Sequence, residues 1–295
     1  MTARVARILI GLATVAGAAA ALRPDVLAVG QAPAASLSAG KRDDLPASEG
    51  AARATLETSP RHSEYMNVMD RLLITRTYIV HPPQGGRSAL VLVIPDDRGL
   101  SDWARAIADQ LAREGFTAIV PDLLTGAGPN GGGTASFASQ DAVARALGQL
   151  PAEQVMQRLE GVWNYAMRLP GMTGKGAVVG FNWGGTYSFR FAGTEPEVGT
   201  MTGAVVFYGR PPEAAALAGV RVPVLGLYAG DDPGVTGTTD ATAAEMKRLA
   251  KSYEPVVFAG AGHGFVRAQT ERAANLTATE QAWSRAIAFL KERTK

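Results

Sequence analysis

The hydrophobic positions of this chain fall into short runs rich in β-branched residues, several of them without polar alternation, and these runs alternate with longer segments of helical periodicity. Apolar runs without polar alternation are typical of parallel strands that are covered on both faces. The runs that predict strands are Leu73–Val80, Ala89–Ile94, Thr117–Val120, Ala177–Phe181, Ala204–Tyr208, Val224–Tyr228 and Val256–Phe258.

The segments between these runs predict helices. Ser101 can cap a helix whose Trp103, Ile107 and Leu111 form one apolar stripe, with Gly115 at its end. Further helices are indicated by the stripe Val155, Leu159, Val162, Ala166 and Leu169 before Pro170, by capping-box spacing at Thr242/Glu245 and Thr277/Glu280, and by the final stripe Trp283, Ala286, Ile287 and Leu290. This alternation predicts an α/β fold, a doubly wound and mostly parallel sheet with helices on both faces.

The first residues have the pattern of a secretory signal. Arg4 and Arg7 precede an uncharged apolar run, Ile8–Leu22, and small residues follow it. The run is shorter than the roughly 20 residues that a membrane span needs. We therefore expect residues 1–30 to be a signal peptide and the protein to be exported, to a periplasm or the extracellular space. An uncleaved N-terminal membrane anchor is the alternative.

The segment after the leader, residues 31–58, is rich in Ala, Ser and Pro and shows no hydrophobic period. Such a composition predicts a mobile linker. One folded domain is then expected over residues 59–295.

Charge and cysteine content exclude several classes of function. The chain has 29 basic and 27 acidic residues, and without residues 1–30 the two counts are equal at 26. The chain without residues 1–30 therefore has no net charge and no electrostatic field that attracts polyanions, so no nucleic-acid partner is expected. The absence of cysteine excludes disulfides, thiolate metal sites and a cysteine nucleophile.

Candidate chemistry follows the predicted strands, because sites in sheets of this kind form at the carboxyl ends of the strands. The strand Ala177–Phe181 runs into a turn in which Gly180 and Gly184 flank Asn182 at a spacing of two. Glycines at this spacing are typical of a nucleophile elbow, a strained strand-to-helix turn that lifts the central side chain above the sheet. Here the central side chain is an amide.

The next two junctions supply an acid and a base. Asp232 follows the predicted strand that ends at Tyr228, and His263 follows the one that ends at Phe258. The chain order of elbow, acid and histidine is that of the α/β-hydrolases. In that arrangement His263 would accept a proton, while Asp232 would fix its tautomer and stabilise the imidazolium.

Several motifs agree with one family in content and order. They are Ser59-Pro60-Arg61-His62 followed by Glu64, Pro121-Asp122-Leu123, Gly180-Phe181-Asn182-Trp183-Gly184-Gly185, Ala229-Gly230-Asp231-Asp232, and Gly260–Arg267. From about Ser59 onward the chain resembles the dienelactone hydrolase family of α/β-hydrolases. The resemblance implies a hydrolase of small ester or lactone substrates. It implies that Asp232 and His263 are catalytic and that Arg267 meets a substrate carboxylate.

The chain departs from the family at two positions. The family nucleophile is Cys, or Ser in some relatives, and Asn182 stands there. A family Glu that helps to control the ionisation of the thiol is replaced by Asp96, which we expect at the substrate-binding part of the site. Loss of a triad nucleophile typically costs on the order of 10⁶ in turnover. The inherited mechanism therefore cannot run unchanged.

The remaining expectations complete the site. The backbone N–H groups of Asp97 and Trp183 are the candidate oxyanion hole. No cofactor and no metal are expected, because His62 and His81 show no ligand spacing around them. The expected partner is a small molecule, the expected state is a monomer, and no stable membrane association is expected after removal of the leader.

Three interpretations of function stay open. The first is a hydrolase of small esters or lactones whose chemistry is lost or altered. The second is a catalytically inactive protein that binds a small carboxylate. The third retains hydrolysis, with His263 activating water against a carbonyl held by backbone N–H groups. Asn182 is the feature that divides them, and the effect of His263→Ala on ester turnover would separate them.

Overall fold

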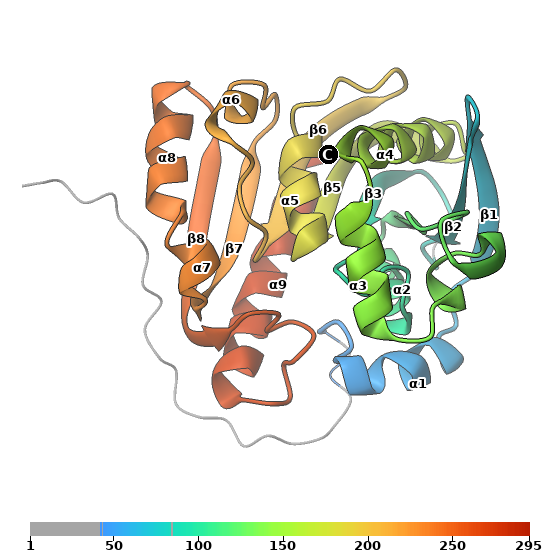
Figure 1. Cartoon of the computed structure of the whole chain (residues 1–295), viewed down its shortest axis with the longest axis horizontal. Helices are drawn as coiled ribbons and strands as arrows, with labels where there is room; N and C mark the ends of the chain where they lie inside the picture. Colours follow the sequence, from blue (N-terminus) through green and yellow to red (C-terminus); the bar gives the residue numbers. More distant parts are fainter. Residues whose placement is uncertain (1–41, 43, 84) are drawn as a thin grey trace, which may run out of the picture.

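An eight-stranded, mostly parallel sheet forms the centre of the computed structural model, which describes residues 42, 44–83 and 85–295 (Figure 1). The strands are β1 (Ser63–Asp70), β2 (Leu73–Val80), β3 (Ser88–Ile94), β4 (Thr117–Pro121), β5 (Met172–Phe181), β6 (Thr200–Phe207), β7 (Val224–Asp231) and β8 (Tyr253–Gly262). Their order across the sheet is β1-β2-β4-β3-β5-β6-β7-β8. Strands β3 to β8 run parallel, whereas β2 is antiparallel to both of its neighbours. The predicted α/β fold is confirmed.

Helices cover both faces of the sheet. They are α1 (Ala52–Glu57), α2 (Asp102–Arg113), α3 (Gln140–Gln149), α4 (Ala152–Met167), α5 (Trp183–Phe191), α6 (Ala214–Leu217), α7 (Pro233–Thr236), α8 (Thr239–Arg248) and α9 (Ala273–Arg293). Three short 3₁₀ turns lie at Glu49–Ala51, Pro129–Gly131 and Thr134–Ser136. Buried residues of α1, α2 and α9 belong to the hydrophobic cluster on one face, and those of α3, α4, α5 and α8 belong to the cluster on the other.

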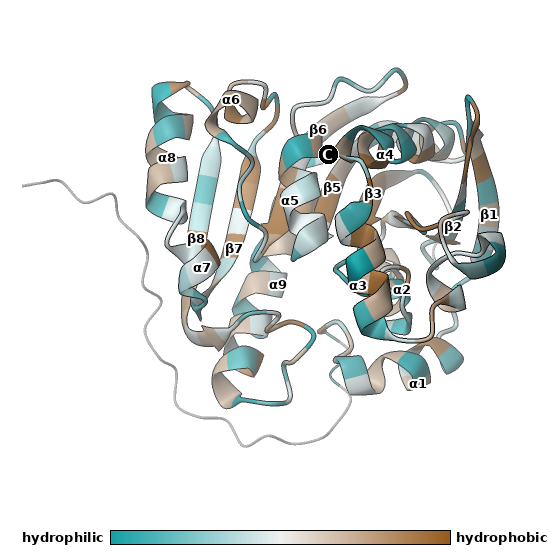
Figure 2. Ribbon diagram, viewed as in Figure 1, coloured by the Kyte–Doolittle hydropathy of each residue, from teal (hydrophilic) through white to brown (hydrophobic). Residues whose placement is uncertain are grey.

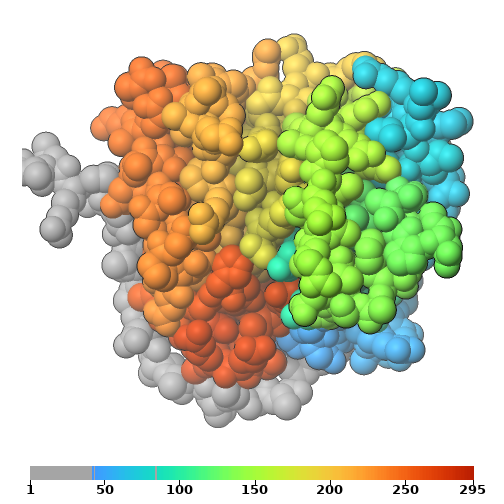
Figure 3. All heavy atoms as spheres, viewed as in Figure 1, coloured from blue at the N-terminus to red at the C-terminus, as the bar shows by residue number. Residues whose placement is uncertain are grey.

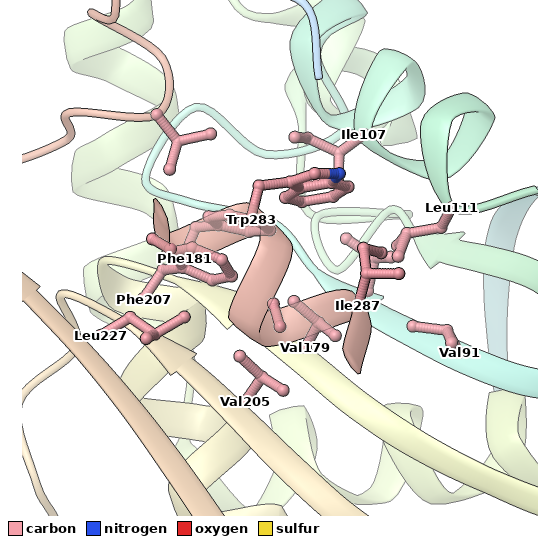
Figure 4. Packing of buried hydrophobic residues seen from close by; sticks show 14 of the residues in the cluster. Val91, Ile107, Leu111, Val179, Phe181, Val205, Phe207, Leu227, Trp283 and Ile287 are labelled. Atoms are coloured by element: carbon pink, nitrogen blue, oxygen red, sulfur yellow. The ribbon is translucent and has the colours of Figure 1, made fainter. Parts of the chain in front are cut away.

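The alternation of strand side chains divides the core in two. In β3, Val91 and Val93 belong to the cluster beneath α2 and α9, while Leu90 and Leu92 belong to the opposite cluster. Trp283 of α9 packs with the strand residues of the first cluster (Figure 4). In Figure 2 the hydrophobic colour marks β5 at the centre, and hydrophilic bands mark outer helices such as α8. The apolar run of β3 is therefore buried on both faces, as its pattern predicts, whereas β2 near the edge of the sheet keeps exposed residues.

Helix starts agree with the sequence prediction in one case and differ in two. The hydroxyl of Ser101 accepts a hydrogen bond from the N–H of Ala104 at 3.2 Å, which confirms the predicted cap of α2. The capping-box expectation is wrong at Thr242 and Thr277, which lie inside α8 and α9. Thr242 instead donates its hydroxyl proton to the carbonyl of Thr238, one turn earlier, at 2.8 Å.

The mobile linker predicted over residues 31–58 does not extend over residues 44–58. Leu45 and Ala52 are buried in the core cluster, and the carbonyl of Ala47 accepts a hydrogen bond from the indole N–H of Trp103 at 3.0 Å. In Figure 3 this blue segment lies against the C-terminal part of the chain. Several residues of this segment, Leu45 and Ala52 among them, are buried although its composition is that of a linker. The folded domain therefore begins earlier than residue 59.

The predicted signal peptide, residues 1–30, lies outside the described residues. Among the residues that the structure describes, no helix is both long and apolar enough to cross a membrane.

Candidate active site

Asn182 occupies the sharp turn between β5 and α5. Its backbone angles are φ 49° and ψ −115°, a left-handed conformation that is strained for a residue with a side chain. The turn is fixed on both sides, since the N–H of Asn182 donates to the carbonyl of Phe207 at 3.0 Å and its carbonyl accepts from the N–H of Thr186 at 3.1 Å. The strand-turn-helix context that a nucleophile elbow requires is present, with an amide at its tip.

The glycines of the elbow are required by close backbone packing. A Cβ added at Gly180 would lie 2.1 Å from the carbonyl oxygen of Gly184. A Cβ added at Gly184 would lie 2.2 Å from the carbonyl oxygen of Pro95, in the loop after β3. The start of α5 is therefore pressed against the β3 loop, and only glycine permits that approach.

His263 and Asp232 form a hydrogen-bonded pair at the same edge of the sheet. The Nδ1 atom of His263 lies 2.6 Å from Oδ2 of Asp232. The Asp232 side chain is 14% exposed and the His263 side chain 37% exposed, so the acid is the more enclosed partner. With Nδ1 facing the carboxylate, Nε2 is the nitrogen that can accept a proton from a substrate or from water.

Tyr208 belongs to this site, although the sequence pattern did not single it out. It follows β6 directly, has a positive φ of 41°, and packs its ring edge-on against His263 with 5.2 Å between centroids. Burial raises the pKa of its hydroxyl well above the ordinary value, so Tyr208 stays neutral. The available signal was its position at the carboxyl end of a predicted strand, before Gly209.

Asp96 and Arg267 form a second pair, and Asp96 is almost fully buried. Nη1 of Arg267 donates to Oδ2 of Asp96 at 2.6 Å, and the N–H of Arg98 donates to Oδ1 at 3.0 Å. Burial raises the pKa of the Asp96 carboxyl to about 6, although Arg267 acts in the opposite direction. The structure therefore brings together the two residues predicted to bind substrate, and each is already a partner of the other.

Other carboxylates surround Arg267. Oδ1 of Asp97 and Oε2 of Glu49 each lie 3.9 Å from its guanidinium, and Glu49 also pairs with Arg98 at 2.9 Å. Those two oxygens are buried and have no hydrogen-bond partner among the described residues. Sequence reasoning missed Glu49, because it lies in the segment that was interpreted as a linker.

The backbone groups predicted as oxyanion donors lie in the loop after β3 and at the start of α5, and these two segments are in contact. Trp183 is the first residue of α5, so no earlier helical turn offers a carbonyl to its N–H. Asp97 follows Pro95, whose carbonyl faces Gly184 beside Trp183. This contact places the β3 loop beside the start of α5. The Trp183 side chain is partly buried and packs on Tyr187, with 4.4 Å between ring centroids.

The raised pKa of Asp96 predicts a measurable pH dependence of stability. A carboxyl whose pKa is about 6 when folded and 3.8 in its ordinary state binds its proton more tightly in the folded protein. This tighter proton binding adds on the order of 3 kcal/mol to the free energy of unfolding. The stabilisation is fully present below about pH 4 and is lost as the pH rises through 6. We expect the free energy of unfolding of Asp96→Asn, relative to the parent, to rise over this interval. Urea titrations at several pH values measure it.

Asp97→Asn is the matched control for that experiment, because Asp97 is the neighbouring residue and its side chain is 42% exposed. A difference between Asp96→Asn and the parent that stays constant from pH 4 to pH 7 would contradict the expectation.

Taken together, a mostly parallel sheet, an elbow after β5 and an Asp–His pair after β7 and β8 define an α/β-hydrolase. The model of the dienelactone hydrolase family matches residues 75–294. The chain belongs to the dienelactone hydrolase family.

Known relatives agree with this assignment. A protein of Escherichia coli (strain K12) named "Putative carboxymethylenebutenolidase" is 28% identical over 229 residues, which cover 73% of this chain and 81% of the relative. Among solved structures, the Klebsiella pneumoniae subsp. pneumoniae MGH 78578 protein named "Putative Dienelactone Hydrolase" superposes with a TM-score of 0.69 at 22% identity, over 79% of this chain and 99% of its own. The dienelactone hydrolase from Anabaena variabilis ATCC 29413 has a TM-score of 0.60 at 21% identity, over 80% and 99%. The structural likenesses show the fold.

Proposed function

We propose that this protein acts on small ester or lactone substrates and that Asn182 impairs or alters its hydrolysis. The observation that carries the proposal is the amide at the tip of a well-formed elbow, in a chain that keeps a paired Asp232 and His263 after β7 and β8. An amide nitrogen is not a nucleophile near neutral pH, so no acyl-enzyme can form on this residue. The hydrogen bond between Asp232 and His263, 2.6 Å long, supports acid–base chemistry at this site.

Water is the attacking group in the hydrolysis that these residues support. His263, oriented by Asp232, takes a proton from water through Nε2 as the water oxygen bonds to the ester carbonyl carbon. The backbone N–H groups of Asp97 and Trp183 stabilise the negative charge that develops on the carbonyl oxygen. His263 then returns the proton to the leaving alkoxide, and the products are an acid and an alcohol. Asn182 contributes hydrogen bonds to the bound substrate.

The second candidate function is a binding protein for a small carboxylate without turnover. Asn182 at the nucleophile position also favours this function, because loss of a nucleophile leaves only substrate binding and oxyanion stabilisation. In that case Arg267 and the backbone N–H groups would hold the ligand, and His263 would be dispensable for affinity.

Ester turnover by the purified parent and by His263→Ala tests the proposal. A general base typically contributes 10²–10⁴-fold, so we expect the variant to lose at least about 100-fold in kcat/KM. His62→Ala, which changes a histidine before β1, is the matched control and should retain parental turnover. Equal rates for the parent and His263→Ala would contradict hydrolysis by this site and favour the binding protein.

A carboxylate-bearing substrate is part of the proposal and depends on Arg267. Its guanidinium has five donors, and Nη1 is engaged by Asp96, so a ligand carboxylate must use the others. We expect an acid to bind more tightly than its methyl ester, by about 1.5–3 kcal/mol, and Arg267→Ala to abolish the difference. Calorimetry with both ligands measures it. If the parent binds acid and ester equally, the carboxylates around Arg267 exclude anions, and the ligand class is neutral.

We further propose that the protein is exported, that it acts as a monomer, and that it uses no cofactor. Export is supported by Arg4, Arg7 and the apolar run Ile8–Leu22 in the sequence. The neutral body of the chain supports a small molecule as the partner, in preference to nucleic acid or a stable membrane association.

A further inference from the structure

Two of the three histidines of the chain lie together on the hairpin at the edge of the sheet, outside the active site. His62 precedes β1, His81 follows β2, and Glu64 is the second residue of β1. A nitrogen of each imidazole and an oxygen of the Glu64 carboxylate all lie within 4.8 Å of one another. The three side chains are at least partly exposed, so an ion in solution can reach them.

The register of the hairpin explains this cluster. Ser63 pairs with Val80, and the N–H of His81 donates to the carbonyl of His62 at 3.0 Å, so the two histidines are cross-strand partners. Glu64 is two residues from His62 and therefore points to the same face of the sheet. Linear spacing along the sequence could not show this. The sequence predicted no metal site only because these histidines lie far apart along the chain. The hairpin brings them together, so that prediction no longer holds for this cluster.

The distances suit a divalent transition metal. Ligand atoms that lie about 2.0–2.2 Å from a tetrahedral Zn²⁺ are about 3.3–3.5 Å apart. Nε2 of His81 lies 3.3 Å from Oε1 of Glu64. The two imidazole rings are nearly parallel, at 25°, with 5.5 Å between their centroids. The remaining ligand atom, on His62, lies within 4.8 Å of both.

The backbone around the cluster is held in place. Arg61, next to His62, pairs with the buried carboxylate of Asp109 in α2, and one of its bonds is 2.8 Å long. His81 is followed by Pro82 and Pro83, which restrict the chain as it leaves β2. A site whose ligands are already placed loses less conformational entropy when a metal binds.

The cluster lies at the end of the sheet opposite the active site. Val80 pairs with Ala118 near the start of β4, so His81 is level with the beginnings of the parallel strands. Asn182, Asp232 and His263 follow the ends of those strands. A metal at the cluster is therefore separate from the hydrolytic machinery.

We propose that His62, Glu64 and His81 bind one divalent transition-metal ion, with Zn²⁺ as the best match to two imidazoles and a carboxylate, and that the ion ties the edge strand β1 to β2. Water supplies the remaining coordination. Because the ion binds the folded hairpin and not the unfolded chain, it stabilises the fold.

Zn²⁺ binding by the full, untagged chain tests the proposal, measured by competition with a chromogenic chelator. We expect one equivalent to bind with a Kd of about 10 μM or tighter. Even loss of a residue that only hydrogen-bonds to a metal ligand costs about 10–100-fold in metal affinity, so His62→Gln, Glu64→Gln and His81→Gln should each weaken binding at least tenfold. His263→Gln is the matched control, because it removes the remaining histidine, and it should leave the Kd unchanged.

A thermal readout keeps the test independent of the chelator. At a hundredfold excess of Zn²⁺ over Kd, the Tm of the parent should rise by roughly 5–10 °C, and that of His81→Gln should not rise. The proposal is overturned if the parent binds less than half an equivalent at 100 μM free Zn²⁺. It is equally overturned if His263→Gln abolishes binding while His81→Gln does not, because the ion would then sit in the active site.

Discussion

The variant Asn182→Cys is expected to hydrolyse activated esters or lactones at least about 10³-fold faster than the parent. Loss of a triad nucleophile typically costs on the order of 10⁶ in turnover, and a partial recovery of that loss is expected because Asp96 replaces the family Glu that helps to control the thiol. The elbow already holds residue 182 in its strained conformation, and His263 and Asp232 are already paired at 2.6 Å. A thiol paired with a histidine ionises readily and is a strong nucleophile. Steady-state turnover with a chromogenic ester measures the gain.

Two controls make this result specific. Asn182→Ala removes the amide without adding a nucleophile and should stay at or below the parental rate. The rate of Asn182→Cys should also vanish on thiol alkylation, because the natural chain has no cysteine. A folded Asn182→Cys variant with no turnover above the parent would show that the site has diverged beyond its nucleophile.

Gly184→Ala is expected to destabilise the protein by about 3 kcal/mol or more. The added Cβ would lie 2.2 Å from the carbonyl oxygen of Pro95 and 2.3 Å from that of Ile94. Both are backbone atoms at the end of a fully buried strand, so they cannot move without disturbing the sheet. Urea unfolding of parent and variant measures the change, and failure of the variant to fold would be the extreme form of the same result.

Gly148→Ala is the matched control for this substitution. Gly148 lies in α3, and a Cβ there would meet no atom within 4 Å. Alanine should therefore stabilise the helix by about 0.5–1 kcal/mol relative to glycine. A Gly184→Ala protein that unfolds within 1 kcal/mol of the parent would contradict the close packing at the elbow.

Patterns that report on buried, regular structure could be predicted from the sequence. The apolar run Ala89–Ile94 lies within β3, whose residues are all buried, and the glycine spacing around Asn182 anticipates an elbow that the structure contains. Both features follow from local rules, namely burial on two faces and a turn that only glycine permits.

Features that depend on contacts distant in sequence could not be predicted. The edge strand β1 has few buried residues, so its sequence lacks the apolar run of a central strand. The same hairpin joins His62 to His81, which are 19 positions apart. Arg267 was expected to meet a ligand, yet its nearest anion is Asp96, 171 positions away. Glu49 reaches the site only because Leu45 and Ala52 anchor a polar segment to the core.

The central claim is that the site lacks only a nucleophile, and covalent trapping of Asn182→Cys tests it most directly. The variant is mixed with a slowly deacylating ester and analysed by intact-protein and peptide mass spectrometry. One acyl group per chain is expected, on residue 182, and it should form much more slowly when His263→Ala is added. A folded variant that remains unacylated, or that is acylated equally fast without His263, would contradict it.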